Sequence, residues 1–538
     1  MTRPILRNKL YLYLTEFFAG MAVMAVELGA SRLLAPYFSS SQIVWTIIIG
    51  TIMIAMALGN LYGGRSADRD PNPDRLYRRI LIASIWIALI PVVGKYVILA
   101  ISAVMIFSVN ANYLIWAAFA ACMVIFVFPL FLLGTVTPSL AKYSMENLED
   151  NARIVGTLGA ANTVGSIIGT FVPTFVTIPA VGTSITFLIF AGILLVLGLI
   201  YFISTKTRSA AAVAGVAVFL LSCALGYRSN FAFWKDNLVY EGESVYNYLQ
   251  VEETDDSVIL STNVLFGVQS ILRRDASLTG MYYDYALAAP MMAGAEEKLA
   301  EGQDFEVLIL GMGTGTYGSQ CTRYFPGIQI EGVEIDEKIT RLAHRYFEMP
   351  EDLNVCTYDG RAYLNAVEKR YDVIMVDAYQ DITIPFQMSS VEFFTMVREH
   401  LKDDGVLVVN MNMHGEREGE INHYLSDTIA AVFPEVRTID VPNSTNRELF
   451  ASCNPEMLET MSRNSALCKD GEVRGLMERM SGNLTPWQAG EHLMTDDRAP
   501  VELLGMRVID DLIRDEVAYY KGIFRDQGLS GLIEAFSF

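Results

Sequence analysis

The first 226 residues are dominated by long apolar runs that short polar segments separate. The runs cover approximately residues 10–34, 42–62, 80–101, 111–134, 155–180, 184–204 and 209–226. Most of them approach the roughly 20 residues that a bilayer-spanning helix needs. The first run is too long, and too closely followed by others, to be a cleaved signal peptide. We therefore predict an all-α multi-span membrane domain of about seven helices over residues 1–226.

Few charged residues interrupt these runs. Glu16, Glu27 and Arg32 fall in the first run, and Lys95 falls in the third. A carboxylate inside a bilayer is costly and is a functional candidate for that reason. Glu27 lies deeper in its run than Glu16, so it is the better candidate. Two roles are open for it: a structural one with Arg32 as a partner, and a path for a cationic amine.

The pattern changes after Tyr227, where charged residues become frequent and apolar runs become short. Three segments are typical of strands joined by turns, which predicts a small β-hairpin subdomain over residues 227–300: they are 244–253, 257–263 and 268–272. From residue 305 onward, strand-like and helix-like segments alternate, as in a parallel sheet. The strands expected there are 305–310, 328–336, one that ends near 357, 371–377 and 405–410. We expect a Rossmann-like α/β domain over residues 301–538 that ends in a helical tail.

A glycine-rich turn follows the first of these parallel strands. Gly311, Gly313 and Gly315 form a GxGxG sequence between that strand and the next helix. Glu334 ends the second strand, 23 positions after Gly311, near the roughly 20 positions expected of a carboxylate that grips a ribose diol. Gly318 comes two positions later than the third glycine of a dinucleotide site. The spacing therefore favours a mononucleoside ligand such as S-adenosylmethionine over NAD.

Two further acidic residues close strands at the same edge. Asp359 lies beside Gly360 at the end of the third strand, where it can meet an adenine amino group. Asp377 closes the fourth strand, at the carboxyl edge where ligands bind in such sheets. Either aspartate can instead cap a helix or a turn. The loop after Asp377 can fold over a substrate.

Composition and charge narrow the classes of function. Hydrophobic residues make up 52% of the chain and charged residues 19%, against about 25% charged in soluble domains. The net charge of −20 disfavours nucleic acid as a partner. The six cysteines form no CxxC pair, and the five histidines form no HExxH motif. We expect no metal and no nucleic acid.

These motifs together resemble the spermidine synthase (polyamine aminopropyltransferase) family, in its branch fused to a membrane domain. The segments that carry the resemblance are YNYLQV from Tyr246, YYDY from Tyr282, GMGTGTYG from Gly311, VEID from Val333, YDG from Tyr358, DAY from Asp377 and TDDRAPVE from Thr495. They span residues 239–505 in the family's order. The membrane part is similar only through loose features such as GRSADR from Gly64.

The resemblance implies a role for each matching residue. Glu334 would hold the ribose hydroxyls and Asp359 the adenine amino group. Asn247 stands near the nucleoside, where the family usually has Gln. Tyr282 would line the amine site, and Asp377 would take a proton from the attacking amine. The substrate-binding set implied in this way is Tyr282, Thr314, Tyr379 and Gln380.

Two of these positions depart from the family's pattern. Thr314 replaces an aspartate that contacts the aminopropyl end, and Gln380 replaces a second aspartate after the catalytic one. Two anionic contacts to amines are therefore neutral, and Asp284 and Asp381 are candidates to replace them. The open alternatives are a lyase, cyclase or other alkyl transferase that uses intact S-adenosylmethionine, and a polyamine or nucleoside transporter or sensor without catalysis.

The resemblance also implies the ligands and the location. The co-substrate would be decarboxylated S-adenosylmethionine or S-adenosylmethionine, and the other partners a polyamine or another small cation, the lipid bilayer and further copies in a homo-oligomer. A multi-pass inner-membrane protein with a cytoplasmic catalytic domain is expected, because an adenosyl co-substrate is made in the cytosol.

The basic residues oppose that orientation. They occupy one set of alternate loops: Arg3, Arg7, Lys9, Arg65, Arg69, Arg75, Arg78, Arg79, Lys142, Arg153, Lys206 and Arg208. The opposite loops, near 35–41, 102–110 and 181–183, have no Lys or Arg. The positive-inside rule then puts the N-terminus in the cytoplasm, and seven spans put the C-terminal half outside. Two explanations stay open: an uncounted short span or re-entrant helix within 96–109, or a C-terminal half that faces out. No single reassignment of the spans keeps every basic loop inside.

Overall fold

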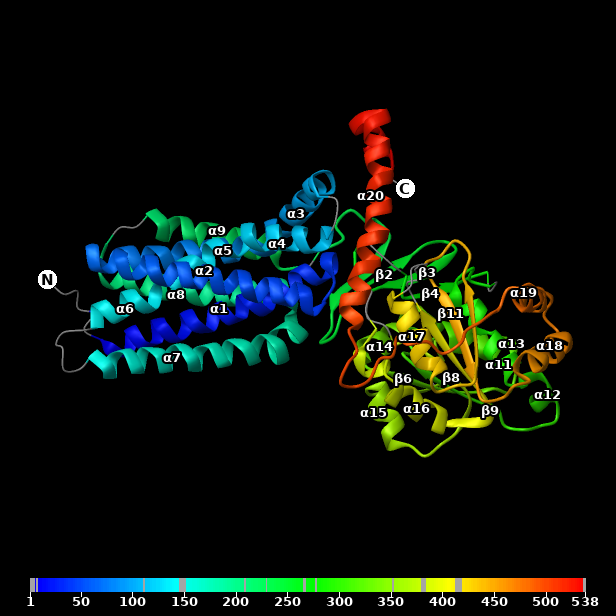
Figure 1. Ribbon diagram of the computed structural model, residues 1–538. Helices are drawn as coiled ribbons and strands as arrows, with labels where there is room; N and C mark the ends of the chain where they lie inside the picture. Colours follow the sequence, from blue (N-terminus) through cyan, green and yellow to red (C-terminus); the bar gives the residue numbers. More distant parts are fainter. Residues whose placement is uncertain are drawn as a thin grey trace.

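A computed structural model describes residues 5, 8–109, 112–144, 151–207, 210–228, 230–264, 268–275, 278–350, 353–378, 384–411 and 419–535. Arg3, Arg7, Arg208, Tyr379, Gln380 and Asp381, all named above, lie outside these described residues. The chain forms a helical N-terminal bundle, followed by a small antiparallel sheet and a Rossmann-like α/β part (Figure 1).

The bundle holds α1 (Lys9–Phe38), α2 (Gln42–Arg69), α3 (Pro73–Ser108), α4 (Tyr113–Ile125), α5 (Val127–Gly134), α6 (Val136–Ser144), α7 (Asn151–Val172), a π-helical turn (Pro173–Thr177), α8 (Ile178–Ser204) and α9 (Ala210–Gly226). Gly182, with φ +81°, interrupts the helical geometry of α8 near its start, so the chain turns there. Both α7 and the rest of α8 pack along α1. The α/β part adjoins the end of the bundle that lies farther from the N-terminus (Figure 1).

Close contact between α1 and α7 depends on glycine. A Cβ on Gly165 would lie 1.9 Å from the carbonyl oxygen of Phe17, and one on Gly169 would lie 2.2 Å from that of Met21. Both distances are far below van der Waals contact, so a larger residue would push the helices apart. The small residues of this segment therefore serve helix packing, as in other tightly packed bundles.

Two expectations about the bundle were wrong: the separate span within 96–109 and the pairing of Glu27 with Arg32. α3 runs on through residue 108, so 96–109 forms no separate span. Glu16 is fully buried whereas Glu27 is only partly buried; Glu16 accepts hydrogen bonds from Thr137 Oγ1 at 2.5 Å and Asn162 Nδ2 at 2.8 Å. Arg32 donates to the carbonyl oxygens of Ser244 and Val245. It therefore joins the bundle to the small sheet, and the pairing with Glu27 is not formed.

The small sheet is antiparallel, in the order β1 (Leu238–Glu243), β2 (Tyr248–Glu253), β3 (Ser257–Ser261) and β4 (Ser270–Arg273). β1 was not expected, and β2 begins four residues later than the first predicted strand. Polar contacts fix this sheet to the bundle. The Val264 N–H donates to the Pro36 carbonyl at 3.0 Å, and the Glu243 carboxylate accepts from Thr183 N at 2.8 Å and Thr183 Oγ1 at 2.6 Å.

The large sheet has the order β12-β10-β11-β9-β8-β5-β6-β7. Its strands are β5 (Glu306–Leu310), β6 (Gln329–Glu334), β7 (Asn354–Thr357), β8 (Tyr371–Val376), β9 (Leu401–Met411), β10 (Glu435–Asp440), β11 (Arg447–Ser452) and β12 (Thr485–Pro486). β5 to β9 are parallel to one another, as expected. β10 to β12 extend the sheet with antiparallel pairs and were not expected.

Helices cover both faces of this sheet. On one face lie α15 (Gly360–Ala366), α16 (Val391–Glu399) and α17 (Ile421–Ala430), which pack on alternate sheet residues such as Leu310 and Val376. The other face carries α10 (Tyr282–Ala286), α11 (Ala288–Met292), α12 (Ala295–Ala300), α13 (Thr316–Tyr324), α14 (Glu337–Tyr346), α18 (Met457–Leu467) and α19 (Gly471–Ser481). The last helix, α20 (Val501–Ala535), starts beside the sheet and extends away from it (Figure 1).

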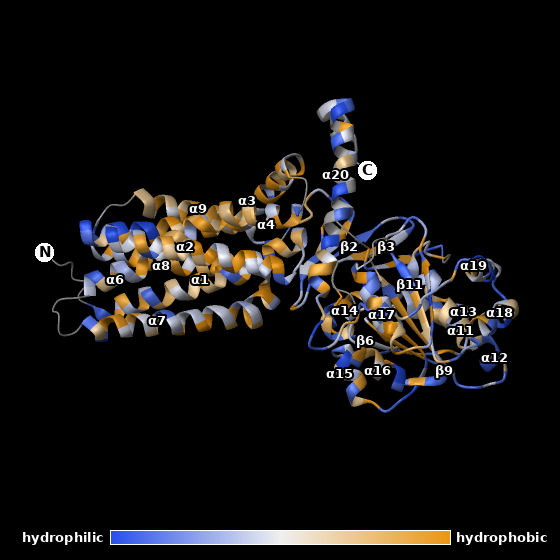
Figure 2. Cartoon of the chain, viewed as in Figure 1, coloured by the Kyte–Doolittle hydropathy of each residue, from blue (hydrophilic) through white to orange (hydrophobic). Residues whose placement is uncertain are grey.

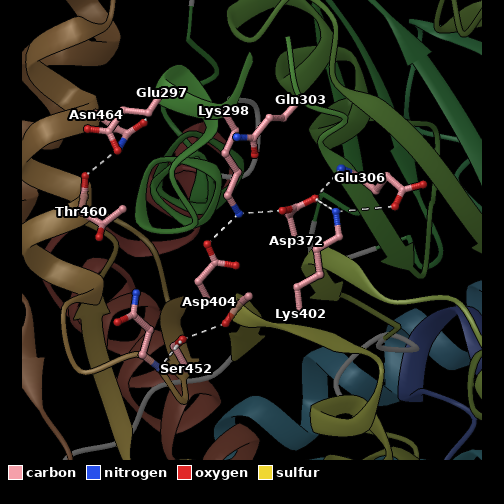
Figure 3. Close-up of polar contacts among 12 residues, drawn as sticks. Glu297, Lys298, Gln303, Glu306, Asp372, Lys402, Asp404, Ser452, Thr460 and Asn464 are labelled. Carbon is pink, nitrogen blue, oxygen red and sulfur yellow. Dashed lines mark hydrogen bonds and ion pairs between the residues drawn. The ribbon is translucent and has the colours of Figure 1, made fainter. Parts of the chain in front are cut away.

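A buried carboxylate ties the start of β8 to its neighbours (Figure 3). Asp372, on the central strand, has a side chain that is 1% exposed. Its Oδ1 accepts from Lys298 Nζ at 2.8 Å, and its Oδ2 accepts from Lys402 Nζ at 2.7 Å and from the Glu306 N–H at 2.8 Å. Lys298 also pairs with Asp404 at 2.8 Å. These contacts join α12, β5, β8 and β9 at the edge opposite to the strand ends that carry Glu334 and Asp377.

Replacing Asp372 should therefore destabilise the α/β part. In Asp372→Asn the two ammonium groups lose their buried anionic partner, and we expect unfolding to need about 2–3 kcal/mol less free energy. Denaturant or thermal unfolding of the purified protein measures this loss. Asp403→Asn, which alters an exposed carboxylate 3.7 Å from Arg370, is the matched control and should leave stability unchanged. Equal stability of the two variants would contradict the role of Asp372.

Candidate active site

A cavity of about 770 Å³ lies at the carboxyl edge of the parallel strands. We call it the edge cavity. Its volume is in the range of small-molecule sites. It brings together seven residues that the sequence predicted: Asn247, Gly311, Gly313, Glu334, Asp359, Gly360 and Asp377.

The glycine turn is shaped by backbone that only glycine adopts easily. Gly311, Gly313 and Gly315 have φ values of +90°, +56° and +85°, in the region that side chains with a Cβ rarely enter. A Cβ on Gly311 would also lie 2.4 Å from the carbonyl oxygen of Asp377. The turn is thus held against the end of β8, and Gly315 forms the N-cap of α13.

Glu334 ends β6 and points toward this turn. Its Oε2 accepts from the Gly313 N–H at 2.9 Å and its Oε1 from the Asp336 N–H at 3.0 Å. Burial raises the pKa of Glu334 to about 7, while these backbone donors favour the charged form. Each oxygen keeps acceptor capacity, so the carboxylate can receive the two hydroxyl groups of a ribose.

Asp377 follows the last residue of β8. Its Oδ2 accepts from Tyr282 Oη at 2.6 Å and its Oδ1 from Asn410 Nδ2 at 2.9 Å. Burial raises the pKa of Asp377 to about 7, against the lowering effect of those two hydrogen bonds. No ion pair with Lys, Arg or His reaches it within the described residues. A carboxyl group with these properties can take up a proton near neutral pH.

Asp359 and Asn247 line the edge cavity but also have structural partners. Asp359 is the N-cap of α15 and accepts from the Ala362 N–H at 2.8 Å, so it caps the helix while Gly360 lies beside it in the wall. Asn247 donates from Nδ2 to Asp336 Oδ2 at 3.2 Å. That bond fixes the amide on the same strand end that holds Glu334.

Other predicted residues lie outside the edge cavity. Gly315 and Tyr282 do not line it, although the Tyr282 hydroxyl donates a hydrogen bond to Asp377. Thr314 is 2% exposed and lines a separate small hollow, and its hydroxyl has no hydrogen-bond partner among the described residues. Asp284 accepts from Thr279, Gly280 and Gln320, so its charge is used locally and cannot replace the missing acids. Tyr379, Gln380 and Asp381 lie outside the described residues.

Part of the cavity wall comes from segments that the motifs did not indicate. The connection from α1 to α2 contributes Ser40, the first turns of α2 contribute Gln42, Ile43 and Thr46, and the start of α20 contributes Glu502. The Gln42 N–H donates to Glu502 Oε2 at 2.8 Å, which joins the two segments. The sequence of these two segments contains no motif that indicates a site, because their position at the cavity depends on how the bundle packs against the sheet. Asn410 was also missed, but it ends a strand as Asp377 does, so the same rule would have found it.

Among the described residues, no group of three or more His, Cys, Asp or Glu side chains could hold a metal ion. The glycine turn, Glu334 and Asp359 have the arrangement that a nucleoside ligand would need at the carboxyl edge of a Rossmann-like sheet, and the Asp377 carboxylate lies in the same cavity.

Comparison with known proteins assigns the family. The family model described as "Spermine/spermidine synthase domain" matches residues 291–456. A "Probable polyamine aminopropyl transferase" of Bifidobacterium longum is 51% identical over 354 residues, which cover 63% of this chain and 78% of that protein. A "Polyamine aminopropyltransferase" of Vibrio vulnificus is 26% identical over 54% of this chain and 98% of its own. The chain belongs to the spermidine synthase family and is a transferase of the spermidine synthase-like class.

The similarity to solved structures is distant and covers less than half of this chain. Spermidine synthase from Thermotoga maritima is 17% identical, with a TM-score of 0.37, over 45% of this chain and 84% of its own.

Gly311 provides a test of the link between the glycine turn and Asp377. Gly311→Ala places a methyl group against the Asp377 backbone and should reduce turnover about 100-fold by displacing the carboxylate. Gly302→Ala is the matched control, because Gly302 also has a positive φ of +74° but no atom lies within 4 Å of the position that its new methyl group would take. Both variants place an alanine at a positive φ, but only Gly311→Ala should displace the Asp377 carboxylate. Steady-state kinetics and melting temperatures of the two variants therefore distinguish the displacement from backbone strain. Equal turnover in the two variants would rule the displacement out.

Proposed function

We propose that this protein transfers the aminopropyl group of decarboxylated S-adenosylmethionine to an amine of a polyamine and releases methylthioadenosine. The observation that carries the proposal is Asp377, a partly buried carboxylate that Tyr282 and Asn410 hold at the edge of a nucleoside-sized cavity. The names of the Bifidobacterium and Vibrio relatives support the same activity.

The charge of the edge cavity supports cationic reactants. Four carboxylates line it, those of Glu334, Asp359, Asp377 and Glu502, and its described lining includes no Lys, Arg or His. Decarboxylated S-adenosylmethionine carries a sulfonium and an ammonium group, whereas the intact form adds a carboxylate that this lining would repel. The decarboxylated form is therefore the better match.

The chemistry needs an amine with a free lone pair. An alkylamine has a pKa near 10 and arrives as an ammonium ion. Asp377 accepts its proton, and the nitrogen then attacks the propyl carbon that is bonded to sulfur. A carbon–nitrogen bond forms as the carbon–sulfur bond breaks, and the electron pair of the broken bond stays on sulfur, which leaves as a neutral thioether. The protein contributes alignment and a base.

Asp377→Asn tests this role. The amide keeps the hydrogen-bonding shape but cannot take a proton, so we expect kcat to fall about 1000-fold while methylthioadenosine binds within a few-fold of wild type. Mass spectrometry of the products and calorimetry of the nucleoside measure the two effects. Undiminished turnover would remove Asp377 from the mechanism.

The pH profile tests the same carboxylate independently. Because burial raises the pKa of Asp377 to about 7, the base form is present above pH 7 and is lost as the pH falls through that value. With the nucleoside co-substrate saturating, kcat/KM for the amine should bend downward below about pH 7. The residual rate of Asp377→Asn should show no such bend, and a bend that persists in the variant would belong to another group.

We also propose that the bundle spans a lipid bilayer. By length and composition, four described stretches could cross one: Lys9–Phe38, Gln42–Arg69, Pro73–Ile106 and Asn151–Ser204; the bent pair Tyr113–Ile125 and Val127–Ser144 would add a fifth. Figure 2 shows hydrophobic residues along the length of the bundle. Many point outward, including Leu58, Leu61, Leu220 and Phe175, each more than half exposed. Apolar surface of this extent suits contact with lipid.

The orientation of the bundle in the membrane can be argued in two opposite ways. We propose that the catalytic half is cytoplasmic, because its co-substrate is made in the cytosol. The described basic residues of the loops favour the opposite orientation, because they gather at the bundle end that is farther from the α/β part: Lys9, Arg65, Arg69, Arg75, Arg78, Arg79, Lys142, Arg153 and Lys206.

A reporter fused after Phe538 decides between them. We expect a fluorescent protein at this position to fold and an alkaline phosphatase to remain inactive, as for a cytoplasmic C-terminus. An active phosphatase with a dark fluorescent fusion would overturn the cytoplasmic placement and support the orientation that the basic residues indicate.

A further inference from the structure

Arg32 extends from the last two turns of α1 to residues 244–247, which connect β1 to β2 and which we call the β1–β2 turn. Its guanidinium group donates to the carbonyl oxygen of Ser244 at 3.4 Å and to that of Val245. Because the guanidinium is planar, two donors on it fix the orientation of the backbone that accepts them. The position of the β1–β2 turn therefore depends on a residue of the bundle.

The β1–β2 turn holds the side chain of Asp336. The Ser244 hydroxyl donates to Asp336 Oδ2, and Asn247 Nδ2 donates to the same oxygen at 3.2 Å. Within the turn, the Asn247 N–H donates to Ser244 Oγ at 2.8 Å, so the two donors move together. A displacement of the turn would thus withdraw both hydrogen bonds from Asp336 at once.

Asp336 in turn helps to orient Glu334. The Asp336 N–H donates to Glu334 Oε1 at 3.0 Å, while the Gly313 N–H donates to Glu334 Oε2 at 2.9 Å. Ser244, Asp336 and Glu334 are all buried, so water competes little for these bonds. We call the series Arg32, β1–β2 turn, Asp336 and Glu334 the hydrogen-bond chain. It leads from a helix of the bundle to the carboxylate that would receive the ribose hydroxyl groups.

Charge acts along the same path. Asp336 repels Glu334, and a nearby cation offsets such repulsion. The guanidinium group of Arg32 is attracted by Asp336 and by Glu243. Glu243 directly precedes the β1–β2 turn and accepts two hydrogen bonds from Thr183 of α8. Removal of Arg32 would therefore take both hydrogen bonds and positive charge from the start of the hydrogen-bond chain.

We propose that Arg32 is a positioning residue of the nucleoside site. Through the hydrogen-bond chain it holds Asn247 and Glu334 in the geometry that binds the nucleoside, so nucleoside affinity depends on the docking of the bundle. Coupling between two sites is reciprocal, and bound nucleoside therefore also strengthens that docking. The inference goes beyond the proposed function, which assigns no role to the bundle in binding, and rests on it for the identity of the ligand.

Replacement of Arg32 tests the proposal in the full-length protein. In Arg32→Met we expect the Kd of methylthioadenosine, measured by calorimetry, to rise about 10-fold, within the usual range of coupling between sites. Arg32→Lys keeps the charge and one donor, so it should lose only about 3-fold. Melting temperatures show whether both variants fold. Wild-type affinity in folded Arg32→Met would overturn the proposal.

Steady-state kinetics distinguishes positioning from a general loss of structure. The KM for decarboxylated S-adenosylmethionine should rise in parallel with the Kd. At saturating donor, kcat and the KM for the amine should stay within about 2-fold of wild type, because Tyr282 and Asn410 hold Asp377 through separate contacts. Equal losses in all three parameters would overturn the proposal, since Arg32 would then only support the fold.

Lys95→Met is the matched control. Lys95 of α3 also donates from the bundle to a backbone carbonyl beyond it, that of Asn230 at 2.7 Å, but it belongs to no step of the hydrogen-bond chain. Its replacement should leave the Kd of methylthioadenosine unchanged. A loss equal to that of Arg32→Met would overturn the specific role of Arg32.

A double-mutant cycle tests the path itself. Ser244→Ala removes the hydroxyl that links the β1–β2 turn to Asp336, so part of the effect of Arg32→Met should already be present in it. The double variant should therefore bind methylthioadenosine less weakly than the product of the two single effects predicts. Effects that multiply fully would show that Arg32 acts by another path and would overturn the proposal.

The assays also separate this inference from the proposed reaction. If methylthioadenosine binds in the way that depends on Arg32 but no extended polyamine is produced, the proposed reaction fails and the positioning role stands. If polyamine is produced and Arg32→Met keeps the wild-type Kd and donor KM, the reaction stands and the positioning role fails.

Discussion

Strand β8 has an aspartate near its beginning, Asp372, and another directly after its end, Asp377. Asp372 is buried within the sheet and Asp377 is partly buried at its edge, and a carboxylate that has lost water is unfavourable without partners. Asp372 is compensated by two lysine ammonium groups and a backbone N–H. Asp377 receives only a phenol and an amide. The first carboxylate joins neighbouring strands, whereas the second has no cationic partner among the described residues, which suits the proton acceptor of the proposed reaction.

Parallel strands impose the position of the reactive end. All of their carboxyl ends meet at one edge, so residues that are 66 positions apart, Gly311 and Asp377, come into backbone contact. The antiparallel strand β11 continues the sheet beyond β9, where its second residue, Glu448, is paired with Asn410. In the proposed function the nucleoside would lie over the ends of β5 to β7 and the reacting atoms at the end of β8.

The sequence was most informative where chemistry and strand ends coincide. Gly311, Glu334, Asp359 and Asp377 were predicted because each lies at the end of a recognisable parallel strand, and the edge cavity contains all four. The position of Glu448 beside Asn410 could not be predicted in this way, because it depends on the pairing of β11 with β9, which links distant parts of the chain. The deeper burial of Glu16 compared with Glu27 could not be predicted for a similar reason. The residues of α6 and α7 that enclose Glu16 are more than 100 positions away in the sequence.

The wall that Ser40, Gln42, Ile43 and Thr46 contribute has an evolutionary consequence. In a chain with separable halves, recombination near residue 227 could attach the α/β part to any bundle. Here such an exchange would also replace a part of the edge cavity and the contact from Gln42 to Glu502. The shape of the edge cavity therefore depends on both halves together. Descendants should inherit the bundle and the catalytic part as one unit, with substitutions around residues 40–46 tracking those around residues 499–503.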